Sequence, residues 1–87
     1  MRDTFERLKK VYLENAGDDA PVENFAEDAE LVRDLGCDSV TLLYMAMSLE
    51  EEFGISFSNT DLQSFKTVGG TVEIIERLMA EKNKKED

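Results

Sequence analysis

The stretch that decides the fold is DLGCDSV, Asp34–Val40, where an irregular polar segment gives way to an amphipathic helix. Its glycine favours a turn, and its Asp-Ser pair is typical of a helix start. Beyond it, apolar residues recur at helical spacing as far as Phe53, and Gly54 follows as a typical helix stop. The sequence therefore predicts a helix that begins at Asp38 or Ser39 and ends at Phe53.

The apolar residues of this predicted helix divide between two faces. A helix turns by about 100° per residue, so that the spacing assigns each side chain a direction. One direction holds the residues expected in the core: Leu42, Ala46, Leu49 and Phe53. The roughly opposite direction holds three apolar residues and one acid that are expected to be exposed: Val40, Tyr44, Met47 and Glu51. Three exposed apolar side chains on one strip form a candidate docking patch.

The segment before this helix contains another helix and a long loop. Apolar spacing predicts a first helix over residues 4–15, with Asp3 and Glu6 as a capping box at its start. Residues 16–38 are mostly polar and lack helical periodicity, which indicates a loop. The loop is expected to be ordered, because three apolar residues in it need burial: Phe25, Leu31 and Leu35.

The remainder of the chain also reads as helical. Ser58 or Asn59 is predicted to cap a short helix that extends through Phe65. A last helix follows, with its apolar face at Val68, Val72, Ile75 and Met79. The fold class is therefore all-α: a small four-helix bundle with three main helices, one short helix and a long ordered loop after the first helix. We expect residues 1–82 to form the domain and 83–87 a flexible charged tail.

Composition limits the function classes. The 87 residues suit one small domain, and Leu, Ile, Val and Phe make up 23 of them, enough for a modest core. With no His and a single Cys, the sequence excludes His-based catalysis, Cys/His zinc sites and a disulfide framework. No apolar stretch has the length of a signal peptide core or a spanning helix, so we expect a cytoplasmic protein without membrane insertion.

Charge indicates the kind of partner. Ten basic and 20 acidic residues give a net charge of −10, and residues 14–65 hold 13 acids against Arg33 as their only base. Nucleic-acid phosphates and anionic lipids would be repelled by such a surface. We therefore expect a monomer that binds no nucleic acid and whose partners have basic surfaces.

Ser39 is the candidate residue for chemistry. In the first turn of the predicted helix its hydroxyl is exposed. A phosphate joined to it would lie near free backbone N–H groups, where an anion is favoured by about 0.3 to 1 kcal/mol. The alternative is that Asp38 and Ser39 are simply capping residues. These residues alone leave both interpretations open.

The spacing of three short motifs resembles the acyl carrier protein family. GCDSV at Gly36–Val40 precedes EEEF at Glu50–Phe53, and a short helix then leads to KTV at Lys66–Val68. The resemblance implies that a separate transferase attaches 4′-phosphopantetheine from coenzyme A to Ser39. The thiol of this arm then carries acyl groups as thioesters for enzymes of fatty-acid, polyketide or related biosynthesis. It also makes Asp38 a contact for the transferase, and it implies no catalytic residue, no metal site and no enzyme activity in the chain itself.

The resemblance assigns partner binding to the same helix. The residues expected to bind partners are Val40, Tyr44, Met47, Glu50 and Glu51. Family members usually carry acids early in this helix, where this chain has Thr41 and Tyr44. The contacts next to Ser39 are therefore expected to be more apolar and less ionic.

A calcium-binding protein and a module without a prosthetic group are the alternatives to an acyl carrier. An EF-hand needs oxygen ligands at alternating positions, a Gly at the sixth and a Glu at the twelfth, and no window of the sequence has that set. A small acidic helical interaction module without a prosthetic group, or a peptidyl or aminoacyl carrier, remains the alternative.

Cys37 is interpreted as a small buried residue. Thiol exchange with the arm, or a link between two chains, is the alternative for Cys37.

The charge distribution predicts a salt-dependent stability. The 13 acids of residues 14–65 repel one another more strongly in the folded than in the unfolded chain, and the screening length rises to about 30 Å at ~0.01 M salt. We expect the melting temperature of the unmodified protein near neutral pH to rise with added sodium chloride or millimolar magnesium, without a stoichiometric calcium site. Thermal melts over a salt series that are flat or falling contradict this.

Overall fold

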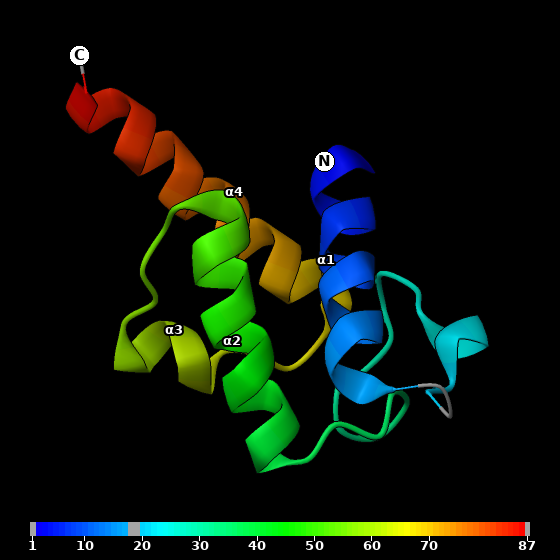
Figure 1. Cartoon of the computed structure of the whole chain (residues 1–87). Helices are drawn as coiled ribbons and strands as arrows, with labels where there is room; N and C mark the ends of the chain where they lie inside the picture. Colours follow the sequence, from blue (N-terminus) through cyan, green and yellow to red (C-terminus); the bar gives the residue numbers. More distant parts are fainter. Residues whose placement is uncertain (1, 18–19, 87) are drawn as a thin grey trace.

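The computed structural model describes residues 2–17 and 20–86, which form five helical elements (Figure 1). These are α1 (Arg2–Ala16), the 3-10 helix η1 (Val22–Asn24), α2 (Ser39–Phe53), α3 (Asn59–Gln63) and α4 (Val68–Glu86). α1 packs against both α2 and α4, and the short α3 lies beside α2 (Figure 1). The predicted all-α bundle of three main helices, one short helix and a long loop after the first helix is confirmed.

α2 begins and ends where its sequence predicts. Asp38 is the N-cap residue, and its carboxylate accepts a hydrogen bond from the backbone N–H of Thr41 at 2.8 Å. Ser39 is the first helical residue. At the other end, Gly54 has a φ of 65° and a ψ of 41°, a left-handed conformation that glycine adopts without strain. Its N–H donates to the carbonyl of Glu50, which closes the last turn.

The buried face of α2 is wider than predicted. Ala46, Leu49 and Phe53 are buried, whereas Leu42, the fourth predicted core residue, is half-buried. Met45 is only 1 % exposed and is a core residue that the predicted core face did not include. Because α1 and α3 lie on different sides of α2 (Figure 1), more than one row of its side chains is covered.

α1 is longer than predicted, and the expected capping box at its start is wrong. The helix already includes Arg2, so that Asp3 lies in its first turn, where it forms an ion pair with Arg7 at 3.6 Å. Arg7 also donates to the side-chain carboxylate of Glu52 at 2.9 Å and to its carbonyl at 2.8 Å, and its guanidinium lies 4.1 Å from the ring centre of Phe53. Arg7 thus places a cation at the negative end of the α2 dipole and joins α1 to α2.

The long loop is ordered by apolar anchors and by backbone bonds to the start of α4. Its three predicted anchors are all buried: Phe25, Leu31 and Leu35. The N–H of Leu31 donates to the carbonyl of Lys66 at 2.9 Å, and the N–H of Val68 donates to the carbonyl of Ala29 at 3.0 Å. These bonds flank an isolated antiparallel bridge between the loop and the segment before α4. These contacts attach residues 25–35 to the bundle.

Gly69 allows the loop to approach α4 this closely. Its N–H donates to the carbonyl of Glu27 at 2.8 Å, and a Cβ on Gly69 would stand 3.0 Å from that same oxygen. A side chain at this position would push the loop away from the helix. The glycine is thus required by packing, at the point where two segments far apart in sequence meet.

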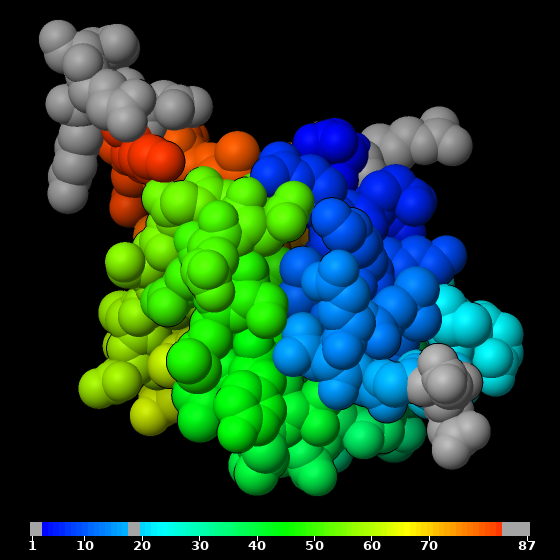
Figure 2. Space-filling model, in the orientation of Figure 1, coloured from blue at the N-terminus to red at the C-terminus, as the bar shows by residue number. Residues whose placement is uncertain are grey.

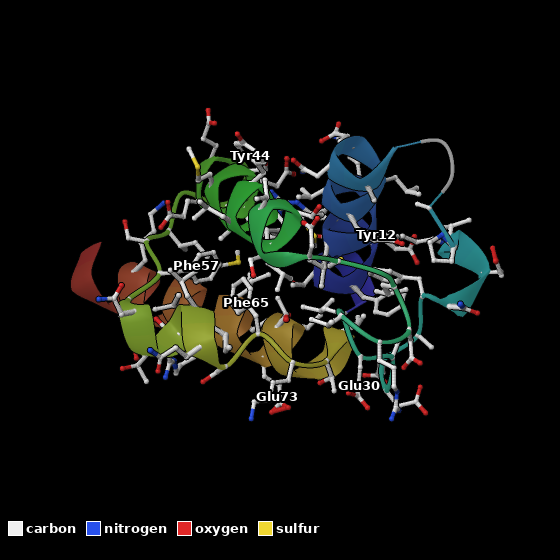
Figure 3. All side chains as sticks on the ribbon, turned by 90° about the horizontal axis from the view of Figure 1, so that it is seen from below. Tyr12, Glu30, Tyr44, Phe57, Phe65 and Glu73 are labelled. Atoms are coloured by element: carbon white, nitrogen blue, oxygen red, sulfur yellow. The ribbon has the colours of Figure 1, made fainter. Side chains whose placement is uncertain are left out.

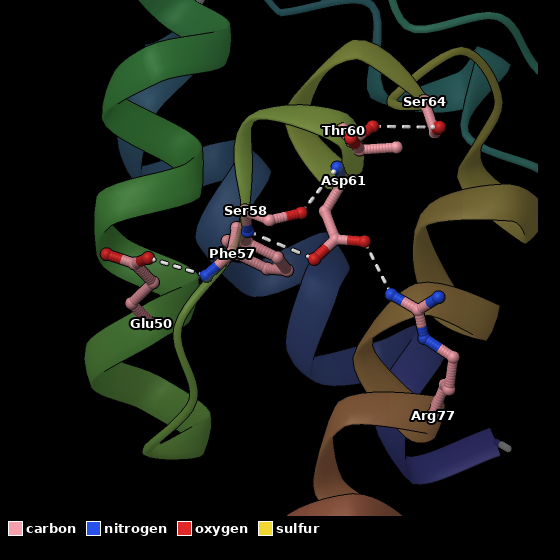
Figure 4. A network of polar contacts seen from close by, with 7 residues as sticks. All are labelled: Glu50, Phe57, Ser58, Thr60, Asp61, Ser64 and Arg77. Atoms are coloured by element: carbon pink, nitrogen blue, oxygen red, sulfur yellow. Dashed lines mark hydrogen bonds and ion pairs between the residues drawn. The ribbon is translucent and has the colours of Figure 1, made fainter.

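A polar network attaches α3 to its neighbours (Figure 4). Ser58 is the N-cap residue; its hydroxyl accepts from the N–H of Asp61 at 3.1 Å, and the Asp61 carboxylate accepts from the N–H of Ser58 at 3.0 Å. The same carboxylate pairs with Arg77 of α4, and Glu50 of α2 accepts from the N–H of Phe57 at 2.8 Å. Polar contacts to both α2 and α4 therefore hold the short helix and the segment before it.

The later helix ends differ in part from prediction. α3 ends at Gln63 rather than Phe65, because the chain turns there to reach α4. α4 begins at Val68, the first residue of its predicted apolar face, and its backbone is helical through Glu86. The flexible tail at 83–87, whose last residue lies outside the described part, stays a prediction. Among the described residues, no helix is both long and apolar enough to cross a membrane.

The pair of Asp61 and Arg77 predicts a pH-dependent contribution of α3 to stability. The pKa of Asp61 is lowered, mainly by the hydrogen bond from the backbone of Ser58. Burial acts in the opposite direction, and the hydrogen bond from Arg77 lowers the pKa further. A pKa lowered in the folded state adds stability that is complete above the ordinary Asp pKa of about 4 and is lost as the pH falls through the lowered value. We expect Arg77→Ala to reduce the free energy of unfolding by about 1 to 2 kcal/mol at neutral pH, and by less in acid.

Urea unfolding at neutral and acid pH measures this effect, with Arg33→Ala as the control. Arg33 is exposed and pairs with the partly exposed Glu30 and Asp34, so its removal should cost less than about 1 kcal/mol. Equal losses for the two variants would show that Arg77 makes only a surface ion pair. A loss from Arg77→Ala that does not shrink in acid would show that Asp61 is not its cause.

Candidate functional site

Ser39 lies exposed at the first residue of α2, at the lower end of this helix in Figure 1. Within residues 2–17 and 20–86, its hydroxyl has no hydrogen-bond partner. The first N–H groups of a helix lack partners inside the helix and carry partial positive charge. The hydroxyl is therefore accessible from solvent, at a place that favours an attached anion.

Asp38 has the capping role that the sequence allowed. The hydrogen bond from the backbone of Thr41 is the main reason that the pKa of Asp38 is lowered. The carboxylate is therefore ionised at neutral pH, and it is exposed directly beside Ser39. The start of α2 thus presents one negative group and one hydroxyl to solvent. A contact between Asp38 and a transferase stays a prediction.

A groove opens beside Ser39, between α2 and the α3 region. Its lining combines one hydroxyl residue with four apolar residues: Ser39, Leu42, Leu43, Leu62 and Phe65. The groove has a volume of about 230 Å³. Hydrocarbon that lies in it would be removed from water, which is favourable. The structure therefore places an apolar shelter next to the hydroxyl.

Helical spacing alone did not predict this groove. It placed Leu42 in the core, where the structure has it half-buried at the groove, and it assigned Leu43 to neither face. Leu43 is 54 % exposed. At about 100° per residue it lies roughly 40° from Ser39, so the spacing contained the signal that joins the two residues.

The predicted docking patch lies on the outside of α2. Its apolar residues, together with Leu43, are named here the outer strip: Val40 (59 % exposed), Leu43 (54 %), Tyr44 (55 %) and Met47 (52 %). In Figure 3, Tyr44 projects from α2 on the side opposite to Phe57 and Phe65. Figure 2 shows α2 and α1 side by side on one face of the molecule. The outer strip is thus open to a partner that approaches α2.

The two acids predicted to bind partners have different surroundings. Glu51 is exposed. Glu50 is half-buried, and its carboxylate accepts the N–H of Phe57 at 2.8 Å. Glu50 therefore supports the segment between α2 and α3, while Glu51 faces solvent. Partner binding by either acid stays a prediction.

Cys37 is a buried residue two positions before Ser39. It is 2 % exposed, and its sulfur lies 3.9 Å from the sulfur of Met45. Its thiol is free, and burial, followed by the charge of Asp38, raises its pKa. The thiol is therefore protonated at neutral pH and shielded from reagents. The interpretation of Cys37 as a small buried residue is confirmed.

The acidic side chains do not gather into a metal site in the part of the chain that the structure describes. There, no group of three or more His, Cys, Asp or Glu side chains is arranged to hold a metal ion. The exposed acids Asp38 and Glu51 lie near opposite ends of α2.

Known proteins resemble this chain over most of its length. A family profile described as "phosphopantetheine attachment site" matches residues 6–75. The acyl carrier protein of Sinorhizobium fredii is 39 % identical over 80 residues, which span 92 % of this chain and 100 % of that protein. The acyl carrier protein AcpP of Rhizobium meliloti has the same identity and coverage.

A solved structure has the same fold. It is the solution structure of hexanoyl acyl carrier protein, a non-natural intermediate, from the actinorhodin polyketide synthase of Streptomyces coelicolor. The two structures agree with a TM-score of 0.76 and 26 % sequence identity, over 87 % of this chain and 90 % of that one. The matched family profile spans Ser39, the groove and the outer strip. The chain therefore belongs to the acyl carrier protein family, whose members carry acyl groups on a phosphopantetheine arm.

Proposed function

We propose that this acyl carrier protein bears its 4′-phosphopantetheine arm on Ser39. The observation that carries the proposal is an exposed hydroxyl with no partner among the described residues, on the first residue of α2 and at the edge of an apolar groove. The motif GCDSV at Gly36–Val40 supports the same residue. The arm supplies a thiol that holds acyl groups as thioesters, for presentation to enzymes of fatty-acid, polyketide or related biosynthesis.

The residues at the start of α2 fit this modification. The Ser39 oxygen forms the new bond to phosphorus of coenzyme A, its proton passes to the transferase, and adenosine 3′,5′-bisphosphate leaves. The N-terminal N–H groups of α2 then favour the phosphodiester, because they carry partial positive charge. Asp38 opposes it by charge but keeps the helix start ordered through Thr41. Asp38 also offers a carboxylate to a basic transferase surface.

The chain itself is proposed to act as a carrier and not as an enzyme. Its acidic surface suits acyl-handling enzymes and a transferase with basic surfaces, because opposite charges speed their encounter. We propose a monomer that works in the cytoplasm, where the free thiol of Cys37 suits a reducing compartment. Residues 1–82 are proposed as the carrier domain and 83–87 as a flexible charged tail.

The outer strip, with Glu51 and Glu50 beside it, is proposed as the partner-binding face. Its apolar side chains lie on the helix that begins at the modified residue, so that an enzyme receiving the arm also meets them. A peptidyl or aminoacyl carrier uses the same kind of arm and is the alternative. The relatives named acyl carrier proteins favour acyl cargo.

Replacement of the hydroxyl tests the attachment residue. Ser39→Ala should lose all transfer from coenzyme A by a broad-specificity phosphopantetheinyl transferase, because no oxygen remains to attack phosphorus. Its stability should change by less than about 0.5 kcal/mol, since Asp38, not Ser39, caps the helix. Intact mass measures the transfer, and Ser56→Ala, at another exposed serine, is the control. A Ser39→Ala protein that gains the mass of the arm contradicts the proposal.

Two methionines of α2 test the partner face. Met47 is 52 % exposed and Met45 is 1 % exposed, so the same truncation probes opposite faces. Met47→Ala should change the free energy of unfolding by less than about 0.5 kcal/mol, whereas Met45→Ala should cost about 2 to 5 kcal/mol.

Met47→Ala and Tyr44→Ala should nevertheless reduce kcat/KM of an acyl-handling enzyme severalfold, because a docking surface loses contact area. Urea unfolding and steady-state assays with the loaded carrier measure the two effects. If Met47→Ala is as destabilising as Met45→Ala, or if neither exposed variant slows the partner, the outer strip is not the docking face.

A further inference from the structure

The negative charge of this chain is concentrated in the long loop between α1 and α2. Residues 17–38 contain eight acids and one base, so the loop carries −7 of the net charge of −10. Four of these acids are exposed in the described part of the loop: Glu23, Glu27, Asp28 and Asp38. By contrast, residues 39–49 of α2, which include Ser39 and the outer strip, contain no charged residue. The negative charge therefore lies beside the proposed docking helix rather than on it.

The loop and Ser39 lie at the same end of the molecule. In Figure 1 the loop occupies the lower half of the view, where α1 ends and α2 begins. Asp38, the last residue of the loop, directly precedes Ser39 and caps α2. The N–H of Gly69 donates to the carbonyl of Glu27 at 2.8 Å and attaches the loop to the start of α4. These contacts hold the charge of the loop at the end that carries Ser39.

The opposite end of the molecule has balanced charge. Thr4 of α1 donates to Glu76 of α4 at 2.8 Å. Arg7 of α1 donates to Glu52 of α2 at 2.9 Å. Three segments therefore meet at this end, at the top of Figure 1: residues 2–10, 50–52 and 76–86. Together they contain eight acids and eight bases, so this end has no net attraction for a charged surface.

We infer that the long loop orients this carrier, so that the Ser39 end turns toward a basic enzyme surface before the two proteins touch. The inference rests on the proposed function, in which Ser39 bears the arm and the partners have basic surfaces. The molecule is 43 Å long, whereas charges in water are screened over about 8 Å at physiological salt. An approaching enzyme therefore responds mainly to the nearer end, and only the loop end attracts it. Encounters that begin at Ser39 are thus favoured.

Two pairs of exposed acids separate the placement of charge from its total: Glu23 with Glu27 in the loop, and Glu6 with Glu81 at the opposite end. None of these four carboxylates forms a hydrogen bond or an ion pair with another described residue. The loop variant is Glu23→Gln/Glu27→Gln, and the far-end variant is Glu6→Gln/Glu81→Gln. Each variant removes two negative charges, so net charge alone predicts the same association rate for both.

The association rate with a broad-specificity phosphopantetheinyl transferase that has a basic docking surface tests the inference. All forms carry Ser39→Ala, so that they bind without reacting, and biolayer interferometry over a sodium chloride series gives the rates. At low salt the loop variant should associate severalfold more slowly than Ser39→Ala alone, and the far-end variant less than twofold more slowly. At about 1 M salt, where the screening length falls to about 3 Å, this difference should vanish.

Acids added at the far end give a test of opposite sign. Lys10→Glu/Lys82→Glu makes the chain four charges more negative, at two exposed residues of the balanced end. Steering by net charge predicts faster association with the basic transferase. Orientation by the loop predicts no gain, because encounters that begin at the wrong end become favourable as well. Thermal melts establish that the variant is folded, and the loop and far-end variants decide the question if it is not.

Two kinds of failure are distinguishable. If the native protein gains no arm from coenzyme A, or if Ser39→Ala gains one, the proposed function is wrong and the inference falls with it. If transfer to Ser39 succeeds but the loop and far-end variants associate at equal rates, the inference alone is wrong. Faster association of Lys10→Glu/Lys82→Glu also overturns it, because total charge would then explain the steering.

Discussion

The backbone hydrogen bonds between the loop and the start of α4 determine where Ser39 lies. Leu31 is bound through its N–H to Lys66, and its carbonyl in turn accepts the N–H of Cys37 at 2.9 Å. Asp38 follows and caps α2, so that a series of hydrogen bonds leads from the segment before α4 to Ser39, the proposed attachment residue. The described part of the segment between α1 and α2 is also anchored by buried apolar side chains: Phe25, Ala29, Leu31, Leu35 and Cys37. The same bridge fixes Lys66, which directly follows the groove residue Phe65, so the start of α2 and the groove share one support.

In the proposed function, one helix serves both cargo and partners. α2 lines the groove with Leu42 and Leu43 and presents the outer strip to solvent, and Leu43 belongs to both surfaces. The acidic surface acts over a distance, because its field reaches a basic partner before contact. The apolar strip acts only at contact, where it excludes water. Under this proposal, approach and final recognition are governed by different residues, which suits a carrier that visits several enzymes.

The parts of the structure that depend on local chemistry could be predicted from the sequence. The ends of α2 follow from a capping Asp and a terminal glycine, and both lie where predicted. The burial of Met45 could not be derived from the single row of apolar residues predicted for the core face, because it depends on which helices cover α2. The α2 side of the groove follows from the spacing of Ser39 and Leu43, but its other side and the closely packed Gly69 arise where segments distant in sequence meet, and such contacts leave no periodic signal. The choice of Ser39 as the candidate attachment residue depended on the resemblance of its motifs to those of the acyl carrier protein family, since a hydroxyl in the first turn of a helix is common.

The burial of Cys37 separates the two thiols of a protein that bears the arm without an acyl group. Alkylating reagents attack the thiolate, and Cys37 is both shielded and shifted toward its protonated form. The terminal sulfur of a flexible arm has neither restriction. A maleimide applied to the folded protein would therefore mark the arm and leave the polypeptide unlabelled. The chain has no other cysteine, so a fluorophore or spin label would enter at a single position without any engineered residue.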